Sequence, residues 1–130
     1  MSIKRAVFDT NVIVSALLSR NGNPANIYRM FLAGTLTLVY CEEILIEYKD
    51  VLYRPHLKIF PSDADIVMAA ISQHGERVSV ITDTNPMLDE DDRIFYDTAK
   101  NTGAYLITGN IKHYPSEPFI LTPSAFLALM

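Results

Sequence analysis

The stretch KRAVFDTNVIVSALL (residues 4–18) decides the fold, because a short apolar segment ends in an acid and a longer apolar run follows at once. Residues 4–9 alternate weakly and end in Asp9, as expected for a buried first strand. The run NVIVSALL extends past usual strand length, and Asn11 can cap it, so we predict a helix there. A strand that leads directly into a helix is typical of an α/β domain.

The rest of the chain continues this alternation. Further helices are predicted after Pro24 over residues 25–34, and over 42–54, 62–75, 89–103 and 123–130. Further strands are predicted over residues 35–41, 77–82, 104–108 and 118–121, with loops at 56–61 and 83–88. The order predicts a single domain over residues 1–130. Its fold class is α/β, a three-layer α/β/α sandwich around a central, mainly parallel five-stranded sheet.

Composition sets limits on the class of protein. The chain has 130 residues, 49% hydrophobic and 20% charged, which is enough for one globular core. The apolar runs are too short to cross a bilayer, and the N-terminus lacks the pattern of a signal peptide, so we expect a cytoplasmic protein. The single cysteine, Cys41, excludes an internal disulfide and is expected to be a small buried residue.

Three acids stand where a buried face is expected. Asp9 ends the first strand, where it could also cap the next helix. Glu47 falls on the apolar stripe of the helix at 42–54, where its alternatives are pairing with Lys49 or Arg54 or a place at the wet margin. Asp92 heads the apolar stripe of the helix at 89–103. Its neighbours Asp89, Glu90 and Asp91 are explained by capping, and Asp97 is expected at the surface.

The convergence of these acids indicates a metal site. Two unit charges about 4 Å apart repel by roughly 4 kcal/mol at an effective dielectric near 20, so three acids that meet need compensation. No lysine or arginine shares an obvious inward position with them. Hard oxygen ligands without His or Cys favour Mg²⁺ or Mn²⁺, and such ions suit phosphodiester hydrolysis. The net charge of −4 does not exclude RNA, because bound cations would supply positive charge where phosphate sits.

The same residues carry a resemblance to a known family. VFDTNVIVSALL (7–18), ILIEYKDVLYRP (44–55) and DEDDRIFYDTAKNTGAYLITGN (89–110) resemble, in this order, three acid-bearing segments of PIN domains. The likeness covers nearly the whole chain. It implies a five-stranded parallel sheet and a Mg²⁺- or Mn²⁺-dependent ribonuclease. In that case Asp9, Glu47 and Asp92 would bind metal and act in catalysis.

The resemblance also implies a setting for the site. Thr10, Asn11 and Thr108 would shape its rim by hydrogen bonding. Small single-domain members are often VapC-like toxins of toxin–antitoxin pairs, usually dimeric and restrained by a cognate antitoxin. Many members have a fourth acid where this chain has Asn110, whose carbonyl oxygen can ligate a metal without adding charge.

Substrate contacts are not specified by the sequence. Basic residues that could flank the rim lie in loop-like stretches, namely Arg20, Arg54, His56, Lys58, Lys112 and His113. Taken one by one, each is better explained as a solvated surface charge, and no pattern of aromatic and basic residues for reading bases is visible.

Other functions fit less well. A haloacid-dehalogenase-type phosphotransferase needs a second aspartate two residues after Asp9, and that position holds Asn11. A receiver domain needs an acidic pair at the first strand and a lysine after a late strand, and LITGN is followed by Ile111 before Lys112. The remaining alternative is a catalytically weak PIN-like protein that acts mainly as a partner-binding or RNA-binding module.

Overall fold

The computed structural model describes residues 3–80 and 90–130 and contains a sheet of five parallel strands. The strands are β1 (Lys4–Phe8), β2 (Leu36–Tyr40), β3 (Glu76–Arg77), β4 (Tyr105–Ile107) and β5 (Ile120–Leu121). Their order is β3-β2-β1-β4-β5, and every pair is parallel. The α/β/α architecture and the five-stranded sheet predicted from the sequence are therefore confirmed.

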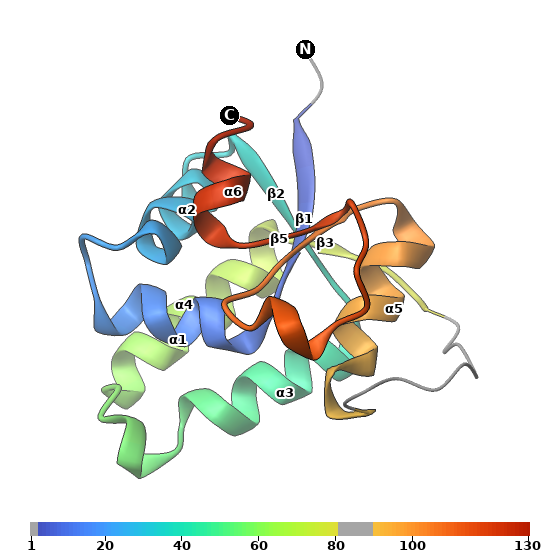
Figure 1. The fold of residues 1–130 in the computed structure, drawn as a ribbon. Coiled ribbons are helices and arrows are strands. Elements are labelled where there is room, and N and C mark those ends of the chain that lie inside the picture. Colours follow the sequence, from blue (N-terminus) through green and yellow to red (C-terminus); the bar gives the residue numbers. More distant parts are fainter. Residues whose placement is uncertain (1–2, 81–89) are drawn as a thin grey trace.

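Six helices cover the sheet in the described part of the chain. They are α1 (Thr10–Leu18), α2 (Asn23–Leu32), α3 (Glu42–Leu52), α4 (Pro61–His74), α5 (Arg93–Thr102) and α6 (Pro123–Leu127). Short 3₁₀ turns lie at Pro55–Leu57 (η1), Glu90–Asp92 (η2) and Ile111–His113 (η3). Figure 1 shows α2 and α6 packed together on one side of the strands and α5 on the other. None of the described helices is long and apolar enough to cross a membrane.

The core lies around the central strand. Ala6, Val7 and Phe8 of β1 are fully buried, because β2 and β4 flank this strand and helices cover both of its faces. Cys41 is also buried, as predicted, at the end of β2. Because β1 is the central strand, its carboxyl end, where Asp9 lies, is at the centre of one edge of the sheet.

Some boundaries differ from the sequence predictions. The N-cap of α1 is Asp9, whose side chain accepts a hydrogen bond from the backbone of Asn11, so the predicted Asn11 cap was wrong. Up to residue 80 the third strand pairs over Glu76–Arg77, because β2 ends at Tyr40; the last two residues of the predicted strand at 77–82 lie outside the described residues. The predicted loop at 56–61 includes part of η1, and the predicted loop at 83–88 lies outside the described residues.

Gly103 joins α5 to β4 and supplies the first stability test. Its φ of 68° lies in the left-handed region, and its backbone N–H bonds to the carbonyl of Ala99 to end the helix. A Cβ at this position would meet nothing within 4 Å, so Gly103→Ala changes only backbone strain. We expect this substitution to lower the free energy of unfolding by about 1 kcal/mol. Gly103→Asn should cost less, because asparagine tolerates this conformation.

Chemical denaturation of both variants tests this expectation. A loss for Gly103→Asn as large as that for Gly103→Ala would contradict the backbone explanation.

Candidate functional site

Asp9 is held at the junction of β1 and β4. Its backbone N–H donates to the carbonyl of Ile107 at 3.0 Å, which continues the pairing of the two strands. The carboxylate is only 6% exposed, and its Oδ2 accepts hydrogen bonds from the Thr108 hydroxyl at 2.9 Å and the Tyr114 hydroxyl at 2.8 Å. The other oxygen, Oδ1, accepts only a long bond of 3.5 Å from the Asn11 amide among the described residues. The two carboxylate oxygens therefore have different surroundings.

The turn after β4 is tied to the start of α1. The Gly109 N–H donates to the side-chain oxygen of Asn11 at 3.1 Å. The Asn110 N–H donates to the Thr108 hydroxyl oxygen at 3.0 Å, so the hydroxyl proton of Thr108 is left to donate to Asp9. Asn11 and Thr108 thus both take part in the hydrogen bonds around Asp9.

Tyr48 fixes α3 against the end of β1. Its hydroxyl donates to the carbonyl of Phe8, the residue before Asp9, and its ring is fully buried against Phe95 of α5. Burial, followed by the charge of Asp9, raises the pKa of Tyr48 well above its ordinary value, so its hydroxyl stays a neutral donor. Glu47 directly precedes Tyr48 in this helix and is brought to the same edge.

Glu47 is half-buried among charges of its own sign. Burial is the main cause that raises its pKa, the carboxylates of Asp50, Asp91 and Asp9 add to the rise, and Arg54 opposes it. Arg54 itself forms an ion pair with Asp50, its Nη2 lying 2.6 Å from Oδ2. Among the described residues no donor bonds to the Glu47 carboxylate, so the alternative of a direct Lys49 or Arg54 partner does not hold.

Asp92 lies at the start of α5 near the same edge. Its side chain is 16% exposed, and Oδ2 is 3.4 Å from Nδ1 of His113. Both Asp9 and Asp92 raise the pKa of Tyr114, after the larger effect of burial. Tyr114 and His113 belong to one short segment, so this segment contacts two of the three acids.

Asp97 departs from the prediction that it lies on the surface. Its side chain is fully buried, and its Oδ2 is 3.9 Å from Nη1 of Arg93, one turn earlier in α5. The reason is that α5 packs against β1, β4 and α3 together, so residues Phe95 to Ala99 are all covered. The prediction assumed that α5 buries one apolar stripe, whereas a wider part of its surface is covered.

The donors near Asp9 fit a hard divalent cation in their chemistry. Carboxylate, hydroxyl and amide oxygens are the ligands that Mg²⁺ and Mn²⁺ prefer. The buried Thr10 hydroxyl has no hydrogen-bond partner among the described residues, which leaves one more oxygen beside Asp9. Within residues 3–80 and 90–130, however, no three His, Cys, Asp or Glu side chains lie close enough to hold one ion.

The residues expected at the margins are exposed. Asn110 lies at the surface, although its backbone is fixed to Thr108. Of the six basic residues expected at the rim, His113 lies beside Asp92, while Arg54 is engaged by Asp50. Within the described part of the chain, His113 is the one of these six that directly contacts a candidate site acid.

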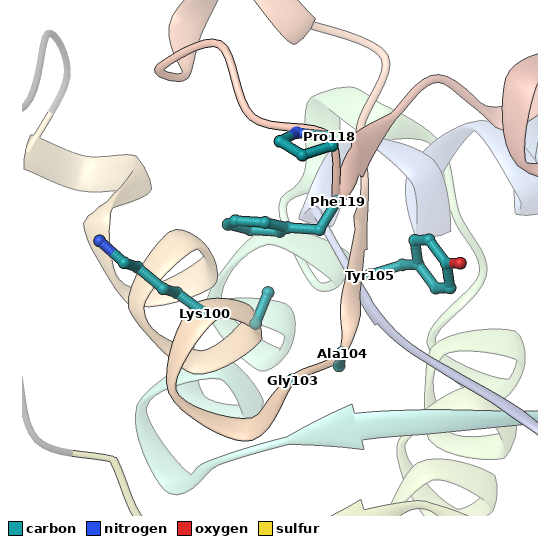
Figure 2. A pocket seen from close by; sticks show the side chains of 7 residues that line it. Lys100, Gly103, Ala104, Tyr105, Pro118 and Phe119 are labelled. Atoms are coloured by element: carbon teal, nitrogen blue, oxygen red, sulfur yellow. The ribbon is translucent and has the colours of Figure 1, made fainter.

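A pocket of about 530 Å³ lies elsewhere, between α5 and the starts of β4 and β5. Figure 2 shows Phe119 pointing toward α5 while the Tyr105 ring turns to the other side of its strand. The residues that line the pocket are mainly apolar, and Lys100 is the charged one among them. Since Thr108 follows the opposite end of β4, this pocket is separate from the carboxylates.

Tyr114 is the site residue that the sequence did not reveal. It lies in an irregular stretch before Pro115, where no periodic pattern predicts burial. The 3₁₀ turn η3 bends the chain back, with the Tyr114 N–H bonded to the carbonyl of Ile111, and places the ring 6% exposed beside Asp9. The one available signal was a large aromatic residue just after two basic ones.

Comparison with known proteins adds to this geometry. A family model described as "PIN domain" matches residues 5–112, which include Asp9, Glu47, Asp92 and Asn110. Uncharacterized protein MJ1680 of Methanocaldococcus jannaschii is 30% identical over 110 residues, which cover 82% of this chain and 70% of that protein. The family model thus spans most of the chain and all of the acids discussed above.

The surroundings of Glu47 give a pH-dependent stability test. Folding raises the pKa of the Glu47 carboxyl, so this group ionises at a lower pH in the unfolded chain than in the folded one. The folded protein therefore loses stability as the pH rises from the unfolded-state pKa through the folded-state pKa. We expect Glu47→Gln to increase the free energy of unfolding at pH 7 in EDTA, because the buried charge and its repulsion are removed. The gain should vanish near pH 4, where Glu47 is already neutral.

Thermal unfolding at both pH values, with Glu43→Gln as an exposed control in the same helix, makes the measurement. Equal gains for the two variants, or a gain at pH 4, would show that the surroundings of Glu47 are not the cause.

Proposed function

The chain belongs to the PIN-domain family, and from this premise we propose that it is a metal-dependent endoribonuclease. PIN domains are in general metal-dependent nucleases, which gives the broad class. The observation that carries the finer proposal is the buried Asp9 carboxylate, with Oδ2 saturated by two hydroxyls and Oδ1 left for a ligand. Such an arrangement suits a carboxylate that binds a cation.

The proposed roles follow from the positions of the residues. Asp9 would be the central ligand of Mg²⁺ or Mn²⁺, with Glu47 of α3 and Asp92, the residue before α5, as further ligands. Thr10, Asn11 and Thr108 would hold the rim, and the carbonyl oxygen of Asn110 could contribute a further, uncharged ligand. A bound ion of this kind would polarise the phosphate, lower the pKa of a water molecule and stabilise the leaving oxygen.

The chain's own residues would prepare the site for that chemistry. Thr108 and Tyr114 fix the orientation of Asp9, and Tyr48 fixes the helix that carries Glu47. Burial is the main cause of the raised pKa of Glu47, and the neighbouring carboxylates add to the rise; a cation would relieve this repulsion. His113, at 3.4 Å from Asp92, is placed to meet a phosphate at the same margin.

The proposal extends to the biological setting of the enzyme. We propose RNA as the substrate and the cytoplasm as the location. We further propose a VapC-like toxin role, with a homodimer restrained by a cognate antitoxin; this rests on the family alone. The competing function is a catalytically weak PIN-like protein that mainly binds a partner or RNA, and Asn110 in place of a fourth acid favours it.

Cleavage of a mixed RNA pool by the purified protein, with Mg²⁺ or Mn²⁺, tests the central claim. We expect cleavage that EDTA abolishes and that Asp9→Asn reduces about a hundredfold or more, because the central ligand loses its charge. Asp63→Asn is the matched control, since Asp63 is exposed in the first turn of α4. It should cleave as the wild type does.

Two results would reject the enzyme. One is the absence of cleavage with either ion, combined with no Mn²⁺ binding by calorimetry, which would favour the partner-binding protein. The other is cleavage that persists in Asp9→Asn, which would point to a contaminating nuclease.

Asn110 offers a gain-of-function test. We expect Asn110→Asp to tighten Mn²⁺ binding several-fold and to raise cleavage at low metal concentration, because it adds a negative ligand at the rim. Titration calorimetry and cleavage across a Mn²⁺ series measure both effects, with Asn101→Asp on α5 as the control for added charge. If the two variants bind Mn²⁺ equally, position 110 has no special place in the site.

A further inference from the structure

Tyr114 contacts Asp9 from an irregular segment, directly after the 3₁₀ turn η3 and outside the strands and α-helices. Its hydroxyl is 2.8 Å from Oδ2, and the ring is almost wholly buried. The residue follows η3, whose backbone bonds from His113 to Asn110 and from Tyr114 to Ile111 close the turn. The ring is thus delivered to Asp9 by local geometry that is itself fixed to the end of β4.

The direction of each hydrogen bond at Oδ2 can be assigned. The Thr108 oxygen already accepts the Asn110 N–H, so its proton points to Asp9. The Tyr114 hydroxyl, 2.8 Å from Oδ2, also donates, because an ionised carboxylate can only accept. Oδ2 therefore accepts two strong bonds and is held in one orientation.

The other oxygen of Asp9 is left with little to bind. Oδ1 has only the 3.5 Å contact with the Asn11 amide, which is at the limit of a hydrogen bond. A carboxylate fixed through one oxygen presents the second in a defined direction. Outer partners of this kind orient metal ligands, and their loss typically costs about 10- to 100-fold in metal affinity or activity.

We propose that Tyr114 is a positioning residue which, with Thr108, holds Oδ2 of Asp9 so that Oδ1 is directed at the divalent cation. This inference rests on the proposed metal-dependent function. It adds that a residue beyond the last matched position of the family model controls the central ligand. Tyr114 does not itself touch the ion or the RNA in this role.

Tyr114→Phe removes the hydroxyl and keeps the ring, and Tyr96→Phe is its matched control. Tyr96 is equally buried, at 6% exposed, and its hydroxyl also donates to a carboxylate, Oε1 of Glu117 at 3.0 Å. The control therefore breaks the same kind of bond away from Asp9. Both variants are made in the full chain and compared by thermal unfolding in EDTA, Mn²⁺ calorimetry, and RNA cleavage across a Mn²⁺ series.

We expect Tyr114→Phe to raise the Mn²⁺ dissociation constant about tenfold, and to shift the Mn²⁺ concentration for half-maximal cleavage by a similar factor. Tyr96→Phe should leave both unchanged, whatever it does to the melting temperature. Thr108→Val removes the other donor to Oδ2, and in that background Tyr114→Phe should cause a larger loss than in the wild type.

Several outcomes would overturn the inference. If wild-type protein cleaves RNA with Mn²⁺ and Tyr114→Phe binds Mn²⁺ as tightly, the positioning role fails while the nuclease stands. If Tyr114→Phe and Tyr96→Phe weaken Mn²⁺ binding equally, the effect is general destabilisation. If Tyr114→Phe does not fold, unchanged Mn²⁺ affinity in folded Thr108→Val would refute the two-donor arrangement. If the wild type neither binds Mn²⁺ nor cleaves, the proposed function fails as well.

Discussion

A buried carboxylate at the end of the central strand is the constraint around which this structure is arranged. Asp9 is almost inaccessible, and a buried charge costs several kcal/mol unless it is hydrogen-bonded. The structure meets this cost with the hydroxyls of Thr108 and Tyr114 and caps α1 with the same side chain. The turn after β4, the segment after η3 and the first helix must therefore all converge on one residue.

The parallel sheet makes that convergence possible. Parallel strands end at one edge, so the carboxyl ends of β1 and β4, paired through Phe8 and Ile107, bring residues about 100 positions apart into contact. Tyr48 adds α3 to the same edge by bonding to the Phe8 carbonyl. Chain topology thus gathers the polar groups, and local hydrogen bonds set their orientation.

Much of this could be predicted from the sequence, for reasons that are physical. Apolar periodicity located the helix that carries Glu47, and the strand ending at Asp9 was evident from its neighbours. The helix predicted over residues 89–103 was placed too early, because α5 begins at Arg93 and Asp92 lies in the 3₁₀ turn before it. Burial of Asp97 was missed because a stripe describes one face, while α5 packs against strands and a helix together. Tyr114 was missed because a 3₁₀ turn has no sequence period. How close the acids come to one another depends on side-chain positions that spacing does not define.

The spacing of the acids bears on how such a site would work. Glu47 carries a raised pKa because it is buried and faces the charges of Asp50, Asp91 and Asp9, and no three metal-binding side chains of the described residues form a closed cluster. Repulsion of this kind keeps carboxylates apart until positive charge arrives. Under the proposed function, RNA phosphates face the same repulsion, so cation and RNA would each favour the binding of the other. Asp9 differs from its neighbours in being fixed beforehand. Under the proposed function, the hydroxyls of Thr108 and Tyr114 fix this central ligand without any contribution from the cation.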